Sequence, residues 1–300
     1  MRMGIDLGGT KVEAVILDDD GSIIWRQRQP TPRHDYGAII STISGLIIAA
    51  EADTGFSGPV GMGIPGSLHP ETGLVRGANT QVLNSRDLRA DCETATSRQF
   101  LIENDANCFA LSEAVNGAAE GYETVFGVIM GTGCGGGFVA NGRVLSGANN
   151  LAGEWGHTPL PWPIDSEYDG HECWCGLTGC LETFISGTAV AADYAARTGV
   201  EKKVEEIAAS TSTDLVAESV LQVLEDRVAR ALAQVISIFD PGAIVLGGGL
   251  SNLDRIYEAV PRKWNRFVFT NMARTPLLKP KYGDSSGVRG AAWLWPDGQA

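Results

Sequence analysis

The chain has 300 residues, of which 44% are hydrophobic and 20% charged. This composition excludes a disordered chain and predicts one large domain or two of ordinary size. A net charge of −13 and an isoelectric point near 4.7 argue against a general binder of nucleic acids or anionic membranes, which would need a basic face. An anionic ligand remains compatible with this charge, because a local cationic site acts within a Debye length of roughly 8 Å.

The N-terminal residues "MRMGIDLGGT" lack the long apolar stretch of an export signal. The longest apolar segment, residues 37–52, is too short and too interrupted to span a membrane. Its apolar residues recur at helical spacing and predict an amphipathic helix packed on a core: Ile39, Ile43, Leu46, Ile47 and Ala50. We therefore expect a cytoplasmic protein without a membrane partner.

The opening stretch "GIDLGGTKVEAVIL" predicts two strands, 3–7 and 12–17, around a glycine turn. A second turn, "DDDG" at 18–21, leads into a third antiparallel strand at 22–29. Glycines let a ligand approach the backbone, and successive N–H groups with a lysine at such a turn form a cradle for anions. Gly8, Gly9, Thr10 and Lys11 therefore predict a phosphate site.

A buried strand over 59–66 follows, then a strand over 99–105 that leads directly into a helix over 106–119. Residues 126–145 then repeat the opening plan of strand, glycine turn, strand, Asn-Gly turn and strand. This duplication predicts two similar α/β domains that face each other across a cleft, with a hinge near 118–122.

Residues 146–182 have the composition of a long loop. A helix from Asp214 to Asp240 is predicted next, and Pro241 ends it. A strand over 243–251 runs into three glycines, and a last helix over 285–295 is expected to end at Pro296. The long helix carries one apolar stripe: Leu221, Leu224, Val228, Leu232, Val235 and Phe239.

Two of the glycine segments, 61–66 and 131–136, satisfy the pattern G-x-G-x-x-G. That pattern indicates dinucleotide binding only where it opens a helix, whereas the first segment contains Pro65 and the second returns as a strand. A nicotinamide enzyme is therefore disfavoured, and no Walker-type loop is present in the sequence. One such turn alone would suggest a tight turn, but three at strand ends favour phosphate binding.

Two further groups of residues could perform chemistry. Asp105 follows a predicted strand and could accept a proton from a hydroxyl group, although the local sequence favours Asn104 or Asp105 as a helix cap. Cys173, Cys175 and Cys180 are closely spaced, which in a reducing compartment indicates a metal site rather than disulfides. A closed zinc site needs a fourth ligand, and His157 and His171 both qualify on the local sequence; three buried thiols are the alternative.

Seven motifs, in order along nearly the whole chain, together resemble the ROK family of sugar kinases in the actin-like ATPase superfamily: "DLGGTK", "GIPG", "ENDAN", "GTGCGGG", "GEWGH", "CWCGLTGCLE" and "IVLGGG". The resemblance implies an α/β fold of two actin-like (ribonuclease H-like) domains with a cleft between them. We expect one domain over 1–118 plus a C-terminal helix at about 288–300. The second, larger domain would cover 119–287 and contain the zinc-binding segment.

The resemblance also implies roles for individual residues. Asp105 matches the catalytic base. His157 is the fourth zinc ligand in the family pattern, beside Cys173, Cys175 and Cys180, and the structural zinc would tie the segments of Glu154 and Glu182 together. Residues expected to bind the sugar are Gly66, Asn79, Asn104, Asp105, Glu154, His157 and Glu182, with a turn role as the alternative for Asn79. Residues expected to bind ATP and Mg²⁺ are Gly4, Asp6, Gly8, Gly9, Thr10, Lys11, Gly131, Thr132, Gly133, Gly135, Gly136, Gly137, Gly247, Gly248 and Gly249.

Within the family, "GEWGHTPLPW" and "GDSSGVRGAAWLW" look most like bacterial fructokinases, whereas "ENDANCFALSEA" looks equally like N-acetylglucosamine kinases. We expect ATP-dependent phosphorylation of a hexose, first of all fructose and also mannose or glucose. The alternatives are an N-acetylglucosamine or N-acetylmannosamine kinase and, from another class, a non-catalytic sugar-sensing protein, against which Lys11, Asp105 and the nucleotide clamp argue. We expect a homodimer or a monomer, with no nucleic-acid partner.

Overall fold

The computed structural model describes residues 1–296, and these fold into two compact units. Unit 1 consists of Met1–Gly121, Gly137–Ala152 and the C-terminal segment from Lys281, and unit 2 consists of Tyr122–Gly136 and Gly153–Pro280. This division differs from the expected domains mainly in the segment 137–152, which packs with the first unit. The last residues of the C-terminal helix expected at 288–300 lie outside the described part of the chain.

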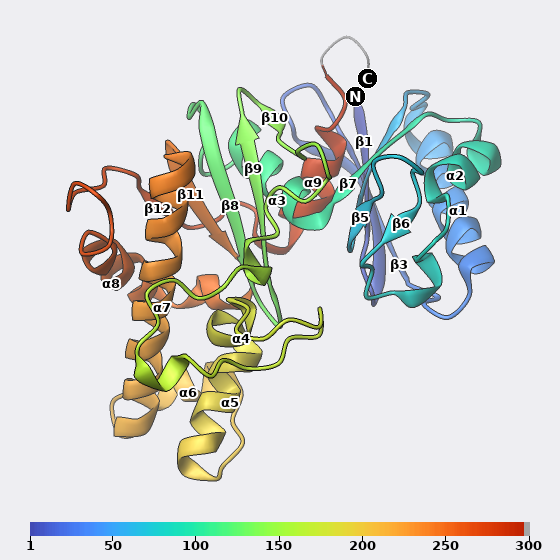
Figure 1. Cartoon of the computed structure of the whole chain (residues 1–300). Coiled ribbons are helices and arrows are strands. Elements are labelled where there is room, and N and C mark those ends of the chain that lie inside the picture. The colour runs from blue at the N-terminus through green and yellow to red at the C-terminus, as the bar shows by residue number, and fades with distance from the viewer. Residues whose placement is uncertain (297–300) are drawn as a thin grey trace. The chain divides into compact units, whose positions relative to one another are not determined.

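Unit 1 is built on a five-stranded sheet with the order β3-β2-β1-β4-β7 (Figure 1). The predicted hairpins form β1 (Arg2–Leu7), β2 (Lys11–Leu17) and β3 (Ile23–Pro30), which pair antiparallel. β4 (Val60–Ile64) and β7 (Phe100–Asn104) run parallel to β1. The carboxyl ends of three strands therefore share one edge of the sheet.

Helices cover both faces of this sheet, as Figure 1 shows. α1 (Tyr36–Thr54) and α2 (Leu88–Thr96) pack on one face, and α3 (Asp105–Val115) and α9 (Ser286–Ala292) lie against the other. The minor ribbon β5 (Ser67–Leu68) and β6 (Val75–Arg76) joins β4 to α2. α9 ends at Ala292, earlier than expected, and residues 293–295 form a turn before Pro296.

α1 confirms the predicted amphipathic helix. By length and composition alone it is the one helix among residues 1–296 that could cross a membrane. The five residues predicted to face the core are the ones that the structure buries, and they pack in the core of unit 1. Burial of this stripe accounts for the apolar composition without a membrane.

The second sheet has the order β10-β9-β8-β11-β12. β8 (Thr124–Met130), β11 (Ala243–Gly247) and β12 (Leu277–Leu278) belong to unit 2 and run parallel. β9 (Cys134–Ala140) passes into unit 1 after Gly136 and pairs there with β10 (Arg143–Val144). The predicted Asn-Gly turn between them is confirmed, since Asn141 and Gly142 have φ values of +50° and +70°, as a two-residue hairpin turn needs.

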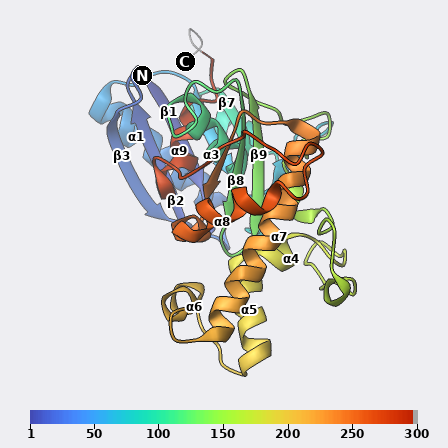
Figure 2. The ribbon, with the colours of Figure 1, turned by 90° about the vertical axis from the view of Figure 1, so that its left-hand side faces the viewer.

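Helices make up most of the rest of unit 2. α7 (Leu215–Phe239) is the predicted long helix, capped by Asp214 and Asp240, and it packs on α8 (Asp254–Trp264). Of its predicted stripe all but Phe239 are fully buried. The shorter helices α4 (Glu182–Ile185), α5 (Gly187–Thr198) and α6 (Val204–Ser210) lie beside α7 (Figure 2).

An ionic cluster fixes the loop before the cysteine segment to α7. Arg227 and Arg230 donate to the buried carboxylate of Glu167 over 2.8–3.0 Å, and Arg230 also donates to the carbonyl group of Trp162 over 2.8 Å. Burial alone would raise the pKa of Glu167, but the hydrogen bonds from Arg230 and Arg227 outweigh it and lower the pKa to about 2. The expected loop over 146–182 is thus anchored although it contains little regular structure.

Candidate functional site

In unit 1, the carboxyl ends of the parallel strands bring the predicted residues together. Asp6 near the end of β1 is paired in register with Gly63 of β4, and Ile64 of β4 with Asn104 of β7. The Asn104 amide donates to the carbonyl oxygen of Gly66 over 3.0 Å. This edge of a parallel sheet is where α/β proteins bind their ligands.

Asn104 and Asp105 have different local roles. Asn104 is the N-cap of α3, since its side-chain oxygen accepts from the backbone N–H groups of Ala106 (2.9 Å) and Asn107 (3.4 Å). Asp105 is the first residue of the helix and is exposed; one of its carboxylate oxygens accepts from the N–H of Ala106 over 2.8 Å. The structure therefore makes Asn104 the helix cap, and the carboxylate of Asp105 stands in the first turn of α3.

Asp6 is the most perturbed carboxyl group of this edge. Burial, followed by repulsion from Asp105 and Glu13, raises the pKa of Asp6 to about 7, against a smaller opposing effect of Lys11. A carboxyl group that is repelled by neighbouring acids is suited to binding a divalent cation, which removes the repulsion. The donor set of this edge thus fits Mg²⁺.

The turn between β1 and β2 is held by residues that the sequence reading missed. The Lys11 ammonium lies 3.3 Å from the buried carboxylate of Glu13, which also pairs with Arg26 and Arg28. Burial opposes the charge on Glu13, but hydrogen bonds from Arg28 and Arg26 outweigh it and hold its pKa below the usual range. Glu13 lies directly opposite Asp6 in the register of β1 and β2. In a strand, residues two apart share a face, so the spacing of Lys11 and Glu13 could have indicated from the sequence that their side chains are neighbours.

Three of the glycines expected at the nucleotide have packing roles in the structure. A Cβ atom at Gly4 would lie 2.2 Å from the carbonyl oxygen of Val288 in α9. At Gly136 it would lie 2.9 Å from the Phe126 and Trp155 rings, and at Gly137 it would lie 2.6 Å from the Asn107 amide oxygen. All three glycines are buried, so close packing alone accounts for them.

Other predicted residues are open to a ligand. Gly8 is half-buried and Gly9 and Thr10 are exposed at the β1–β2 turn. Asn79 is also exposed, beside Thr80, whose hydroxyl oxygen lies within 4 Å of the Cβ position of Gly9. Gly66 has a φ of +83° and lies against the backbone of Arg76–Ala78, so its turn requires glycine.

In unit 2, two glycine turns lie side by side at the ends of β8 and β11. Gly247 pairs in register with Ile129, and a Cβ atom at Gly248 would lie 2.4 Å from the carbonyl oxygen of Met130. Gly131, Thr132 and Gly133 form the first turn, and Gly249 is exposed in the second. Gly135 is half-buried, and its carbonyl group accepts from the Trp155 indole N–H over 3.0 Å.

The first of these turns is connected to α4 and α5. The backbone N–H of Gly187 donates to the carbonyl oxygen of Gly131 over 2.7 Å, and the Thr188 hydroxyl donates to that of Thr132 over 2.8 Å. One carboxylate oxygen of Glu182 accepts from the Cys134 N–H over 2.9 Å. The glycine turn and Glu182 are therefore neighbours within unit 2.

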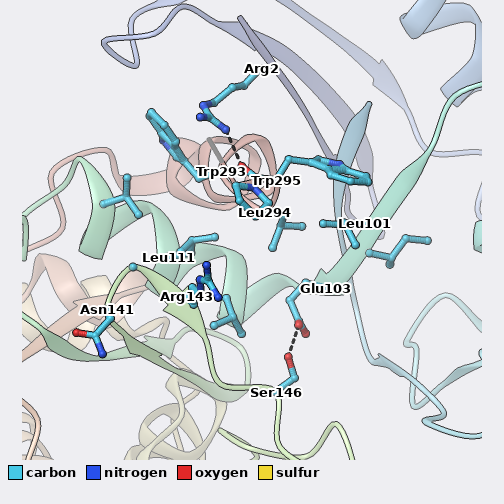
Figure 3. Close-up of a pocket in the computed structure, with 15 residues that line it drawn as sticks. Arg2, Leu101, Glu103, Leu111, Asn141, Arg143, Ser146, Trp293, Leu294 and Trp295 are labelled. Carbon is cyan, nitrogen blue, oxygen red and sulfur yellow. Dashed lines mark hydrogen bonds between the residues drawn. The ribbon is translucent and has the colours of Figure 1, made fainter. Parts of the chain in front are cut away.

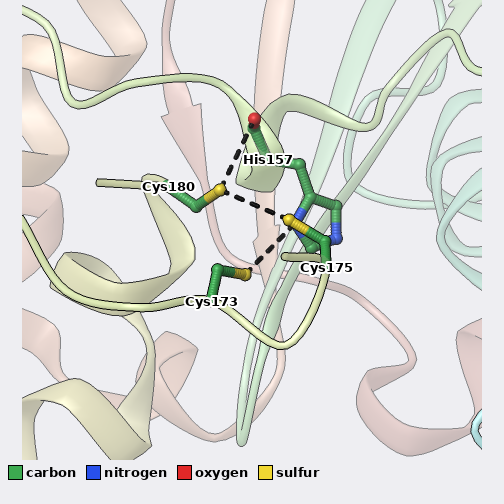
Figure 4. Close-up of side chains that lie close together, drawn as sticks. All are labelled: His157, Cys173, Cys175 and Cys180. Carbon is green, nitrogen blue, oxygen red and sulfur yellow. Dashed lines mark hydrogen bonds between the residues drawn. The ribbon is translucent and has the colours of Figure 1, made fainter. Parts of the chain in front are cut away.

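His157, Cys173, Cys175 and Cys180 come together in unit 2, as Figure 4 shows. Their ligand atoms all lie within 4.8 Å of one another, with Cys173 Sγ 3.6 Å from His157 Nδ1 and Cys175 Sγ 3.6 Å from Cys180 Sγ. Ligands at about 2.3 Å from a tetrahedral zinc ion lie roughly 3.8 Å apart. The donor set and its spacing fit Zn²⁺.

His171, the competing ligand, is not in this cluster; its ring contacts Phe184 instead. Backbone pairing also draws the two ends of the site together, because Leu181 donates to Thr158 over 2.8 Å and Pro159 pairs with Cys180. Trp174, between two of the cysteines, donates its indole N–H to the second carboxylate oxygen of Glu182 over 2.8 Å. Sequence reasoning missed Trp174, whose signal was its place inside the cysteine cluster.

Comparison with known proteins identifies the family. The sequence profile of the ROK family matches residues 2–298. The chain belongs to the ROK family.

Curated relatives of this ROK protein include the N-acetyl-D-glucosamine kinases of Vibrio parahaemolyticus and Yersinia enterocolitica. Each is 38% identical, with 98% of this chain and 99% of the relative covered. Among solved structures, the ROK hexokinase from Thermus thermophilus matches with a TM-score of 0.87 and 32% identity, covering 98% of this chain and 97% of that one. The ROK family glucokinase from Streptomyces griseus, solved with glucose and AMPPNP, matches with a TM-score of 0.79 and 26% identity, covering 98% of both chains.

These likenesses confirm the expected fold class, the two-domain actin-like ATPase fold of the ROK family. They also support a sugar kinase, while the curated relatives favour the N-acetylglucosamine alternative over fructose. The site also contains the half-buried carboxylate of Glu103, which the sequence reading missed. It accepts from the backbone N–H of Asn104 (2.8 Å), the Asn107 amide (3.0 Å) and the Ser146 hydroxyl (2.5 Å).

Proposed function

We propose that this ROK protein is an ATP-dependent kinase that phosphorylates a hydroxyl group of N-acetylglucosamine. The observation that carries the substrate is the 38% identity to N-acetyl-D-glucosamine kinases over 98% of the chain. It replaces fructose as the first choice and makes fructose the comparison substrate. A purely sugar-sensing protein would not need the paired acids Asp6 and Asp105 at the strand ends.

Asp105 is the proposed base. Its carboxylate is exposed at the start of α3, and it can accept the proton of a sugar hydroxyl as the phosphoryl group arrives. Asn104 is fixed by its bonds to α3 and Gly66, so a sugar hydroxyl bound to its amide would be oriented beside Asp105. Such positioning is a main source of rate in phosphoryl transfer.

ATP is proposed to bind to glycine turns of both units. In unit 1 the N–H groups of Gly9 and Thr10 and the Lys11 ammonium would bind phosphate oxygens, and Asp6 would hold Mg²⁺. In unit 2 the turns Gly131–Gly133 and Gly247–Gly249 would contact the nucleotide, and Thr132, Gly248 and Gly249 are their exposed residues. Bound Mg²⁺ supplies neutralisation of the charge on the transferring phosphoryl group.

Glu154, His157 and Glu182 are proposed to bind sugar hydroxyl or amide groups from unit 2. A carboxylate that accepts from a hydroxyl rejects an analogue that lacks it, because the buried acceptor would then be unpaired. Glu182 already accepts from Cys134 and Trp174, which fixes its orientation and leaves further lone pairs for a ligand. The proposed zinc ion would hold Trp174 and His157 in place around Glu182, and it would take no part in the chemistry.

The test is the ratio of kcat/KM values for N-acetylglucosamine, N-acetylmannosamine, glucose, mannose and fructose, measured with ATP and Mg²⁺ in a coupled assay. We expect N-acetylglucosamine to exceed fructose by at least about tenfold. A preference for fructose would restore the fructokinase reading. Absence of turnover with every sugar, together with intact sugar binding, would favour a sensing protein instead. We place the enzyme in the cytoplasm, where both substrates are available.

A further inference from the structure

Unit 1 contains a pocket that lies outside the residues assigned to the proposed reaction. It has a volume of about 840 Å³ and is lined by β7, α3, the β9–β10 hairpin and the segment after α9 (Figure 3). All of its lining residues belong to unit 1. The volume is in the range of small-molecule sites.

The pocket combines cationic and aromatic groups. Arg143 follows the Asn-Gly turn and pairs through its backbone with Ala140, and its guanidinium group has no hydrogen-bond or ion-pair partner within residues 1–296. Arg2 lies over the Trp293 ring, 4.6 Å from its centroid, and donates to the carbonyl group of Trp295 over 2.6 Å. With Glu103 as the one acid among the lining residues, the pocket carries a formal charge of +1 in a chain of net charge −13.

These groups specify a class of ligand. An unpaired guanidinium group binds a phosphate or carboxylate group through charge-assisted hydrogen bonds. Tryptophan rings offer flat apolar surface to a ligand, and the indole of Trp295 is fixed by donation to the Val60 carbonyl group over 3.0 Å. The Glu103 carboxylate and the Asn141 amide can bond to hydroxyl groups.

We propose that this pocket binds a hexose 6-phosphate or hexosamine 6-phosphate and that its occupation inhibits the enzyme. The phosphate group pairs with Arg143, and the sugar ring lies against the tryptophan side of the pocket. The identity of the ligand rests on the proposed function, since this is the class of product that the kinase would make.

Glu103 connects the pocket to the proposed active site. The same carboxylate lines the pocket, accepts from Ser146 at its wall, and accepts from Asn104 and Asn107 at the start of α3. A sugar hydroxyl that donates to Glu103 in place of Ser146 would redistribute these bonds next to Asp105. Inhibition would then lower kcat without competition against the substrate sugar.

The experiment is calorimetric titration of N-acetylglucosamine 6-phosphate into the full chain without ATP, with N-acetylglucosamine present at saturation to block the substrate site. A parallel titration uses fructose 6-phosphate against saturating fructose, and a third uses inorganic phosphate. We expect a sugar phosphate to bind and Arg143→Ala to weaken that binding at least about tenfold. Arg89→Ala removes an exposed arginine that is not in the pocket lining, and it should leave the affinity unchanged.

In initial-rate assays at saturating sugar, the same sugar phosphate should lower kcat of the wild type and of Arg89→Ala but not of Arg143→Ala. Arg143→Ala should retain basal kcat. Binding that is insensitive to Arg143→Ala, equal binding of inorganic phosphate, or binding without a fall in kcat would overturn the proposal. The titrations contain no ATP and report on the pocket even if the kinase assay shows another substrate, so the two proposals can fail separately.

Discussion

Asp105 stands exposed at the first turn of α3, where its removal should affect chemistry far more than folding. Asp105→Asn keeps the size of the side chain and removes the base. We expect kcat to fall by about 10²–10⁴-fold and the dissociation constant of the sugar to stay within a few-fold of wild type. Rapid-quench kinetics and equilibrium sugar binding measure the two effects.

Asp35→Asn is the matched control, because Asp35 caps α1 in the same unit and asparagine caps helices equally well. It should retain wild-type kcat and stability. Near-normal turnover of Asp105→Asn would remove Asp105 from the role of base.

The raised pKa of Asp6 has a consequence for stability. Its folded pKa of about 7 exceeds an unfolded value near 3.9, so the unfolded state binds fewer protons and the free energy of unfolding should fall as pH rises from about 4 to 7. Asp6→Asn removes this contribution. We expect the free energy of unfolding of the variant to exceed that of the wild type by on the order of 2 kcal/mol at pH 8 and to be almost equal to it at pH 4.

Urea unfolding of both proteins at each pH, in EDTA to exclude divalent cations, measures the difference. Stability curves that run parallel between pH 4 and pH 8 would show that Asp6 is not held in its neutral form.

At the residue scale, sequence reasoning predicted that Asp6, Asn104 and Asp105 come together at the strand ends, and it also predicted the cysteine cluster with His157. It could not predict Glu103, Glu13 or Trp174. Their partners lie on other strands or loops, and only tertiary pairing determines which side chains these groups contact. It also assigned Gly4 to the nucleotide, although close packing against α9 requires that glycine.

Among the elements, α9 depends on glycines at its contacts with α3 and the sheet. A Cβ atom at Gly290 would lie 1.6 Å from the carbonyl oxygen of Cys108 in α3. Gly290→Ala therefore must separate the helices, and we expect it to lower the free energy of unfolding by about 3 kcal/mol. Chemical denaturation measures the change.

Gly45→Ala in α1 is the matched control. Gly45 is exposed, and a Cβ atom there would meet nothing within 4 Å. Alanine should stabilise the helix by about 0.5–1 kcal/mol. Equal effects of the two substitutions would contradict the tight contact between α9 and α3.

The ionic cluster on α7 predicts acid sensitivity. The folded pKa of Glu167, about 2, lies below an unfolded value near 4.3, so its stabilisation is present above pH 4.3 and is lost as pH falls toward 2. Glu167→Gln should lower the free energy of unfolding by about 3 kcal/mol at pH 7 and flatten its fall at acid pH, because Arg227 and Arg230 lose their charged partner.

Glu258→Gln, at an exposed position of α8, is the control. It should change neither the free energy of unfolding at pH 7 nor its fall at acid pH. Thermal unfolding between pH 2.5 and pH 7 gives both. A Glu167→Gln variant with the acid sensitivity of wild type would exclude this cluster as the source.

At the scale of elements, hydrophobic periodicity predicted α1 and α7, because burial of one face determines them. Short apolar runs predicted β4 and β11, which are buried on both faces. The end of α9 and the packing of 137–152 with unit 1 were not predicted. Both depend on contacts between segments that are far apart in the sequence, which local patterns do not contain.

For the whole molecule, the proposed zinc site tests how the segment 154–182 is held. His157→Asn should lose one zinc ion per chain, lower the melting temperature and reduce activity, whereas His171→Asn should retain the metal. Elemental analysis with thermal unfolding distinguishes the two histidines. Zinc retained by His157→Asn and lost by His171→Asn would reverse the choice of fourth ligand.

The repeat of the hairpin plan in the sequence predicted two α/β units, and the ROK family fold agrees with it. The choice of sugar could not be reached in this way, because sugars that differ in one substituent are distinguished by a few loop residues. Relatives at 38% identity shifted that choice from fructose to N-acetylglucosamine.

The central claim is transfer of a phosphoryl group from ATP to an amino sugar with Asp105 as base. Mass spectrometry of the reaction products, with wild type and Asp105→Asn incubated in parallel with ATP, Mg²⁺ and equal amounts of N-acetylglucosamine and fructose, tests it directly. We expect phosphorylated N-acetylglucosamine as the main product of the wild type and only traces of it with Asp105→Asn. Phosphorylated fructose as the main product, or equal yields from the two proteins, would contradict it.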